Sequence, residues 1–267
     1  MRVLWAFLKR DLINESSYKL SFFLQLFSIF PVVLMFFFLS RLVGSTISGP
    51  LQPYGGSYFP FVLIGISVQN YLTQSLSSFS GSLRESQLSG TLEAVLSAPI
   101  SLGTFLLGSI LYTFALNSVK ILIYLLIGAL LFGAGLDWAR LPSAFIIIVL
   151  TVTSFASLGI ISASFIILFK KGDPLNYAFS VLSWLVGGVY YPISVLPEWL
   201  QKAALFVPMT HSLEALRQCL LSGRDLSAVT GHLLLLGAWT GIGLPVGLLC
   251  FSRAIRRARV QGTLGHY

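Results

Sequence analysis

The chain has 267 residues, of which 55% are hydrophobic and only 10% are charged, and its mean hydropathy is +0.85. These values exclude an ordinary soluble domain and indicate a polytopic α-helical membrane protein. The formal net charge of +8 indicates basic loops with some attraction to anionic lipids. It does not indicate nucleic-acid binding, because no folded basic domain remains to carry that function.

The first twenty residues have the pattern of an amphipathic helix. Leu8 and Leu12 lie on one face, and Lys9 lies on the other. We expect residues 1–20 to lie along the inner membrane interface. A cleavable signal peptide is not expected, because the apolar run that follows is much longer than a signal-peptide core.

Six apolar segments are expected to cross the membrane, because a helix needs about 20 apolar residues to span the hydrocarbon core. They are Phe22–Leu42, Tyr58–Ser80, Leu102–Phe132, Ser143–Phe169, Leu175–Tyr191 and Gly231–Phe251. Pro31 lies inside the first segment, where we expect a kink in the helix. The predicted fold class is an all-α membrane protein that forms a single transmembrane domain over residues 1–267, without internal repeats.

The distribution of Lys and Arg among the loops predicts the orientation of the chain. With the N-terminus inside, the cytoplasmic set is Arg2, Lys9, Arg10, Lys19, Arg84, Lys170, Lys171, Arg253, Arg256, Arg257 and Arg259. The smaller set, outside or within spans, is Arg41, Lys120, Arg140, Lys202, Arg217 and Arg224. With six spans, both termini are then expected in the cytoplasm.

A polar segment at residues 81–99 interrupts the apolar chain between the second and third spans. Leu88 and Leu92 fall on one stripe of a predicted helix, while Arg84 and Glu93 supply charge. We expect a short amphipathic helix at the cytoplasmic surface that docks a soluble partner, because its apolar stripe needs a covering. The alternative is a solvated loop whose charges simply favour water.

Polar side chains also lie within the second and third spans. The candidates for lining a translocation pathway are Gln69, Asn70, Gln74, Asn117 and Lys120. The amide side chains could equally be hydrogen-bond partners between packed helices. Lys120 either contacts a substrate or an ion-pair partner, or it snorkels to an interface from a tilted helix.

The segment from residue 190 to residue 222 is too apolar for a solvated loop, and its prolines interrupt any membrane-crossing helix. We expect two short re-entrant helices that dip from the outer face. The candidates for an outer gate are Tyr190, Tyr191, Pro192, Pro197 and Trp199. The alternative for the aromatic residues is an ordinary belt at the membrane interface.

No pattern typical of catalysis or metal binding stands out. The three histidines, His211, His232 and His266, have no ligand spacing, so we expect no metal site. Cys219 and Cys250 fall in different predicted environments, and we expect no disulfide between them. There is no G-x-x-x-x-G-K-[ST] phosphate loop, so any ATP hydrolysis must come from another polypeptide.

Two local signatures, together with the layout of spans, resemble the membrane subunit of type-2 ABC exporters, the ABC-2 type transporter family. The first is similar to the coupling helix of the family and comprises Arg84, Gly90, Thr91, Leu92, Glu93, Ala98 and Pro99. The second is similar to its re-entrant region and comprises Tyr191, Pro192, Leu196, Pro197, Glu198, Trp199, Leu200, Pro208, Glu214 and Arg217. The resemblance covers nearly the whole chain.

The resemblance implies a permease of two copies, expected as a homodimer, with two ATPase subunits bound beneath it in a bacterial plasma (inner) membrane. The residues that contact the ATPase would be Arg84, Glu85, Gly90, Thr91, Leu92 and Glu93. This chain would then be no enzyme and would hold no cofactor, because ATP and Mg²⁺ would bind to the ATPase. Membrane lipids are further expected partners.

The resemblance also implies export of an amphiphile, such as a lipid, a lipid-linked glycan or a drug. Two alternatives remain open. An ion-coupled carrier would usually show carboxylates deep within its spans, and none of the nine acidic residues has such a position. A membrane-embedded lipid-modifying enzyme would need catalytic carboxylates or histidines at one face, and only Glu198, Glu214 and His211 come near this.

Overall fold

A computed structural model of the chain describes residues 2–17, 19–43, 48–88, 102–169 and 174–260, and these are helical or irregular, with no strand. The α-helices are α1 (Arg2–Ser17), α2 (Lys19–Phe27), α3 (Ile29–Val43), α4 (Ser48–Leu51), α5 (Tyr58–Leu88), α7 (Leu102–Phe132), α8 (Leu141–Phe169), α9 (Pro174–Val186), α10 (Glu198–Ala204), α11 (Pro208–Leu220) and α12 (Thr230–Val260). Short 3₁₀ turns are η1 (Gln52–Tyr54), η2 (Trp138–Arg140), η3 (Ile193–Val195) and η4 (Leu226–Val229).

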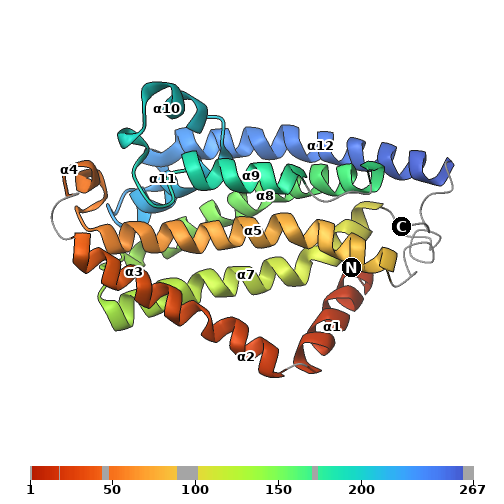
Figure 1. Cartoon of the computed structure of the whole chain (residues 1–267), viewed down its shortest axis with the longest axis horizontal. Coiled ribbons are helices and arrows are strands. Elements are labelled where there is room, and N and C mark those ends of the chain that lie inside the picture. Colours follow the sequence, from red (N-terminus) through yellow and green to blue (C-terminus); the bar gives the residue numbers. More distant parts are fainter. Residues whose placement is uncertain (1, 18, 44–47, 89–101, 170–173, 261–267) are drawn as a thin grey trace.

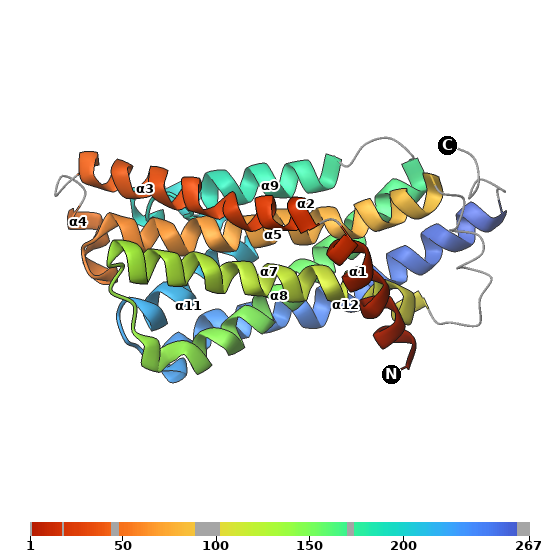
Figure 2. The same cartoon turned by 90° about the horizontal axis from the view of Figure 1, so that it is seen from below.

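The long helices run along one axis and form a bundle around α5 (Figure 1). Helix α5 contacts α3, α7, α8, α9 and α11, and α8 packs most extensively against α12. Seen from below, α3 and α9 lie on one side of the bundle and α12 lies on the opposite side (Figure 2). The central position of α5 follows from its sequence, because every residue from Phe61 to Val68 is buried among its neighbours.

Four segments of the described chain are long and apolar enough to cross a membrane. They are Phe22–Val43, Leu111–Phe132, Trp138–Ile167 and Leu226–Ala258, and α9 adds the shorter apolar segment Leu175–Val186. Helix α5, the predicted second span, has the length but is less apolar, because amides and serines occupy its second half. Its apolar first part, residues 61–68, is buried within the bundle, whereas several polar residues of its second part are exposed.

The first predicted span is broken into α2 and α3 at Ser28. Three residues later, Pro31 has no backbone N–H, and its ring clashes with the carbonyl four residues earlier, at Phe27. The expected kink is therefore confirmed. Ser28 retains one helical bond, from its N–H to the Leu24 carbonyl oxygen at 2.9 Å.

Helix α1 is set at an angle to the bundle and contacts α7 near the end where α12 finishes (Figures 1 and 2). Phe7 packs so closely on Gly108 that a β-carbon there would lie 2.8 Å from the ring. Trp5 and Ile13 remain exposed, and the Lys9 ammonium lies 5.4 Å from the centre of the Trp5 ring. Exposed apolar and cationic groups together suit the interfacial position predicted for this segment.

Two short helices, α10 and α11, occupy the proline-rich region between α9 and α12, as the sequence predicted at the level of secondary structure. Helix α11 is almost entirely buried and contacts α5, α8 and α12. Helix α10 projects from the same end of the bundle (Figure 1).

Candidate functional site

A stripe of exposed polar side chains runs along α5. Asn70, Thr73, Gln74 and Ser77 recur at intervals of three and four residues, which places them on one helical face. The hydroxyls of Thr73 and Ser77 bond to backbone oxygens of their own helix, at 3.0 and 2.8 Å. The Gln74 amide and the amide oxygen of Asn70 are therefore the groups of this stripe that are best able to bind another molecule.

A cavity of about 100 Å³ adjoins this stripe between α2, α5 and α7. It gathers predicted pathway residues from two spans, namely Asn70, Gln74, Asn117 and Lys120. The structure adds Gln25, Ser28, Ser67 and Tyr124 to its polar lining. Sequence reasoning missed Gln25 and Ser28, whose only signal was their position near Pro31 in the first span.

Gln69 does not lie with the other four predicted pathway residues. It does not line the cavity, although Asn70 beside it does. Neighbouring residues of a helix point about 100° apart, so adjacent amides cannot share one face. The side chain of Gln69 is half-buried, and its Oε1 atom has no hydrogen-bond partner within the described part of the chain.

Lys120 lies at the middle of the candidate span Leu111–Phe132, far from both of its ends. Its side chain is half-buried and lines the cavity together with Asn117, one turn earlier on α7. Asn70 stands opposite, and its Nδ2 atom donates to the Ile66 carbonyl at 2.9 Å and to the Tyr124 hydroxyl at 3.1 Å. The cavity thus combines amides, hydroxyls and one ammonium group in the middle of the bundle.

A second polar centre, which sequence reasoning did not single out as a site, surrounds Arg217 of α11. The guanidinium is fully buried and donates to the carbonyl oxygens of Gly188 at 2.7 Å, Val189 at 3.0 Å and Phe61 at 3.1 and 3.2 Å. Its carbon atom lies 3.4 Å from the centre of the Phe61 ring. One side chain thereby fastens α11 to α5 and to the turn after α9.

Glu214 and Tyr54 extend this centre toward the η1 turn. The Tyr54 hydroxyl donates to Glu214 Oε1 at 2.6 Å. Burial and the Glu214 carboxylate both raise the pKa of Tyr54, so the phenol keeps the proton that it donates. Burial lowers the pKa of Arg217 to about 10, so its guanidinium stays protonated at neutral pH.

Two glycines make the close approach to Arg217 possible. A β-carbon on Gly65 would lie 2.2 Å from the Val189 carbonyl oxygen and 2.9 Å from the guanidinium. Gly188 has a φ of +76°, which other residues rarely adopt. These glycines are therefore required by the packing around the buried arginine.

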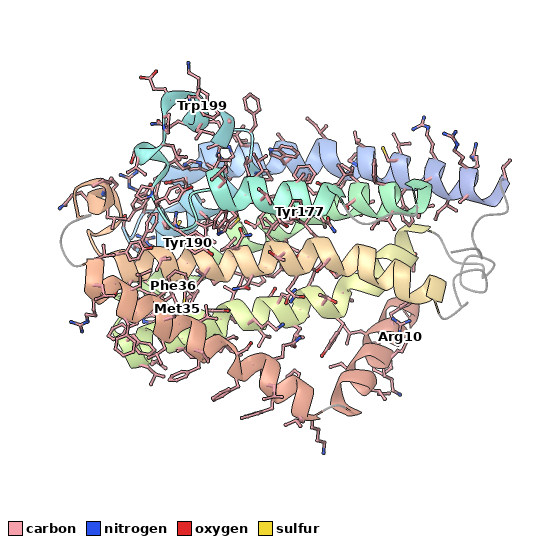
Figure 3. All side chains as sticks on the ribbon, viewed as in Figure 1. Arg10, Met35, Phe36, Tyr177, Tyr190 and Trp199 are labelled. Atoms are coloured by element: carbon pink, nitrogen blue, oxygen red, sulfur yellow. The ribbon has the colours of Figure 1, made fainter. Side chains whose placement is uncertain are left out.

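The predicted gate residues do not gather in one place. Tyr190 is half-buried and stacks on Phe36 of α3, with ring centres 5.6 Å apart, and Pro192 is buried. Trp199 is 69% exposed on α10, well away from Tyr190 (Figure 3). These residues are close together along the chain, but Tyr190 and Pro192 pack in the turn after α9, whereas Trp199 is exposed on α10.

His211 and His232, which have no common spacing in the sequence, meet between α11 and α12. Their Nδ1 atoms lie 3.1 Å apart, and His211 Nε2 lies 2.8 Å from the Leu205 carbonyl oxygen, to which it donates. No group of three or more potential metal ligands occurs among the residues that the structure describes. The pair therefore fastens α11 to α12 in this arrangement.

The predicted coupling residues lie at or beyond the end of α5. Helix α5 continues to Leu88, so residues 81–88 extend the second predicted span instead of starting a separate helix. The backbone of Arg84 and Glu85 belongs to this extension, while Gly90, Thr91, Leu92 and Glu93 lie outside the described residues. The coupling helix stays a prediction.

Comparison with known proteins gives two findings. The family described as ABC-2 type transporter matches residues 2–221 of the chain. The linearmycin resistance permease protein LnrN of Bacillus subtilis (strain 168) is 22% identical over 169 residues, which make up 63% of this chain and 43% of that protein. The matched part of the chain therefore covers less than half the length of this relative.

Proposed function

Because this chain belongs to the ABC-2 type transporter family, we propose that it is the permease of an ATP-driven exporter that moves an amphiphilic molecule across the membrane. A separate ATPase subunit would bind ATP and Mg²⁺, and two copies of each subunit would form the complex. The polar stripe of α5 is the observation that carries this proposal. Asn70, Thr73, Gln74 and Ser77 are exposed in the single chain.

Polar side chains within a span usually face other helices or a water-filled cavity, and rarely lipid. A second copy of the chain would cover the stripe and place two stripes around a shared pathway. The pathway would then be lined by Asn70 and Gln74, with Asn117 and Lys120 in the adjoining cavity. Gln69 would contribute to packing, in agreement with its separate position.

The proposed topology has six spans, with α5 as the second span and α9 with its following turn as the fifth. Lys9 and Arg10 on α1 and Arg253 and Arg256 on α12 are exposed at one end of the bundle. The positive-inside rule favours this end as the cytoplasmic one. The chain would then lie in a bacterial inner membrane with both termini in the cytoplasm. Helices α10 and α11 would then be re-entrant from the outer face, and Tyr190 and Trp199 would lie at the level of substrate release.

Helix α5 offers a direct mechanical link between the two proposed regions. Its 31 residues correspond to a length of about 47 Å, and the hydrocarbon core is only about 30 Å thick. The end near Arg84 and Glu85 would therefore stand in the cytoplasm beside the ATPase. Residues 90–93 would complete the contact, so that closure of the ATPase pair moves a helix that also lines the pathway.

The proposed substrate class is an amphiphile, and the name of the relative adds a reason to include drugs. That relative is named for resistance to linearmycin. An ion-coupled carrier is the alternative for transport, and a lipid-modifying enzyme is the alternative outside transport. Against the carrier, none of the four candidate spans contains an acidic residue, and Asp137, Glu198, Glu214 and Asp225 all lie outside them.

Crosslinking between copies tests the central feature of this proposal. In a background with Cys219→Ser and Cys250→Ser, Asn70→Cys should be joined to a second copy by a short bismaleimide. The matched control is Val246→Cys, which is exposed on α12, a helix on the side of the bundle opposite to α3 and α9 (Figure 2), and it should give no dimer. Equal crosslinking at both positions would contradict a dimer that encloses the α5 stripe.

Reconstitution tests the energy source. The chain, co-purified with its ATPase in vesicles, should move a fluorescent lipid analogue only when ATP is present. A Walker-lysine variant of that ATPase is the control and should show no transport. Transport by the chain alone under an ion gradient would overturn the proposal in favour of a carrier.

A further inference from the structure

Two buried amide atoms beside the cavity between α2, α5 and α7 lack hydrogen-bond partners. Asn117 is only 3% exposed, and its Nδ2 donor has no partner in the described parts of the chain. The Oε1 acceptor of Gln25, on the opposite wall, is also buried and unpartnered there. An unsatisfied buried group costs about 1–3 kcal/mol, so native proteins rarely keep one unless another molecule completes it.

The chemistry of these two atoms defines the missing group. Asn117 requires an acceptor and Gln25 requires a donor. A hydroxyl group supplies both, and a ligand hydroxyl can take the place of a water molecule that bonds these atoms. Gln74 and Lys120 line the same space and carry N–H donors, and the Asn70 amide oxygen can accept from a hydroxyl.

The size of the cavity limits how much of a ligand it can hold. Its volume is about 100 Å³. A water molecule takes about 30 Å³ in the liquid, and an apolar cavity of about 150 Å³ binds benzene. The cavity therefore has room for a few heavy atoms, such as a diol, and not for a whole amphiphile.

The cavity is open on the side of the polar stripe. Asn70 and Gln74 line it and are also exposed on α5. Gln25 and Ser28, which lie at the break between α2 and α3, form the opposite wall. A ligand can thus place a polar group inside while its apolar part stays in the surrounding membrane or pathway.

We propose that this cavity, within a single copy of the chain, binds hydroxyl groups of a polyhydroxylated amphiphile. Asn117 donates to a ligand hydroxyl, Gln25 accepts from one, and Asn70 and Gln74 border the opening. The inference deepens the proposed function in naming the kind of substrate, and it rests on that function only for the route by which the ligand arrives. Binding itself requires neither ATP nor a partner subunit.

Thermal unfolding of the full chain in phosphatidylcholine nanodiscs tests this site with three lipids of equal chain length. They are 1-O-hexadecylglycerol, its di-O-methyl ether and hexadecyl phosphate. The diol should raise the Tm by about 3 °C at saturation, because a ligand that binds only the folded state stabilises it. The ether, which keeps the oxygens but has no O–H donors, should give no rise.

Variants assign the effect to the cavity. Asn117→Leu should abolish the rise caused by the diol. Gln25→Leu, on the opposite wall of the cavity, provides the same test if the first variant folds poorly. Gln69→Leu is the matched control, because this amide neighbours Asn70 but does not line the cavity. It should keep the full rise.

Three results would overturn the inference. Equal rises for the diol and the ether would mean that the hydroxyls are not recognised, and a rise that survives both Leu variants would mean that binding is elsewhere. A larger rise with hexadecyl phosphate would indicate an acidic-headgroup site at Lys120. Failure of ATP-driven transport would contradict the proposed function and leave these binding results unaffected, so the two can be told apart.

Discussion

The centre around Arg217 and the cavity beside Asn117 are both polar and buried, but they differ in how their hydrogen bonds are completed. The guanidinium of Arg217 meets three backbone carbonyls and an aromatic ring within the chain. The Nδ2 atom of Asn117 finds no partner in the described residues. A polar group completed by its own chain stabilises the fold, whereas one left incomplete beside a cavity is available for another molecule.

The largest expected effect is the loss of Arg217. Arg217→Leu removes every side-chain bond to Phe61, Gly188 and Val189 and leaves the last two carbonyls without this buried donor, so we expect the free energy of unfolding to fall by about 3–5 kcal/mol. Unfolding in mixed detergent micelles with increasing dodecyl sulfate measures this change. Arg224→Leu, at an exposed arginine, is the control and should change stability by less than about 0.5 kcal/mol. A stable Arg217→Leu protein would refute the structural role of this centre.

The second effect tests how tightly α5 approaches the turn after α9. Gly65→Ala adds a β-carbon 2.2 Å from the Val189 carbonyl oxygen and should destabilise the fold by about 1–3 kcal/mol. Gly81→Ala lies in the same helix, where an added β-carbon meets no atom within 4 Å. It should be neutral or stabilising by up to about 1 kcal/mol, because Ala favours a helix over Gly. Equal effects at both positions would argue against the close approach.

An effect of similar size is expected from the bond between Tyr54 and Glu214. Tyr54→Phe should cost about 1–3 kcal/mol, since it removes a hydrogen bond to a charged group. The raised pKa of Tyr54 also predicts a pH dependence. Above about pH 10 the unfolded chain loses the phenolic proton while the folded chain keeps it, so the wild-type protein should lose stability as pH rises.

The difference between the wild-type and Tyr54→Phe proteins isolates this group from other tyrosines and lysines. The cost of the substitution should shrink as the pH rises above 10, because the variant has no proton to lose at this position. Unfolding midpoints at pH 8, 10 and 11 measure the difference. A constant difference over this range would mean that Tyr54 titrates normally in the folded protein.

The smallest effect on stability is expected at Asn117, although it is as buried as Arg217. Asn117→Leu removes a donor that has no partner and replaces it with an apolar group of similar size, so the free energy of unfolding should stay within about 1 kcal/mol of wild type or rise. The same micelle titration checks this. A loss comparable to that of Arg217→Leu would show that Asn117 is a structural group and would remove the contrast between the two regions.

The candidate site was only partly readable from the sequence. Amides and a lysine inside apolar spans are unusual enough to be identified one by one, which is how Asn70, Gln74, Asn117 and Lys120 were found. Gln69 has the same chemistry, but the rotation of α5 directs it elsewhere. Arg217 was assigned only to the set outside or within spans and to the re-entrant signature. Its partners could not be named, because they are backbone carbonyls that leave no mark in the sequence.

The sequence by itself determined that the chain is helical, that it belongs in a membrane and where the first span breaks. These properties depend on residues near one another in the chain, because lipid requires long apolar helices and proline removes a local hydrogen bond. Only the tertiary structure decided that α2, α5 and α7 enclose a polar cavity and that α11 is fastened through Arg217. Such contacts depend on the rotation and depth at which whole helices pack, and these are set by many side chains acting together.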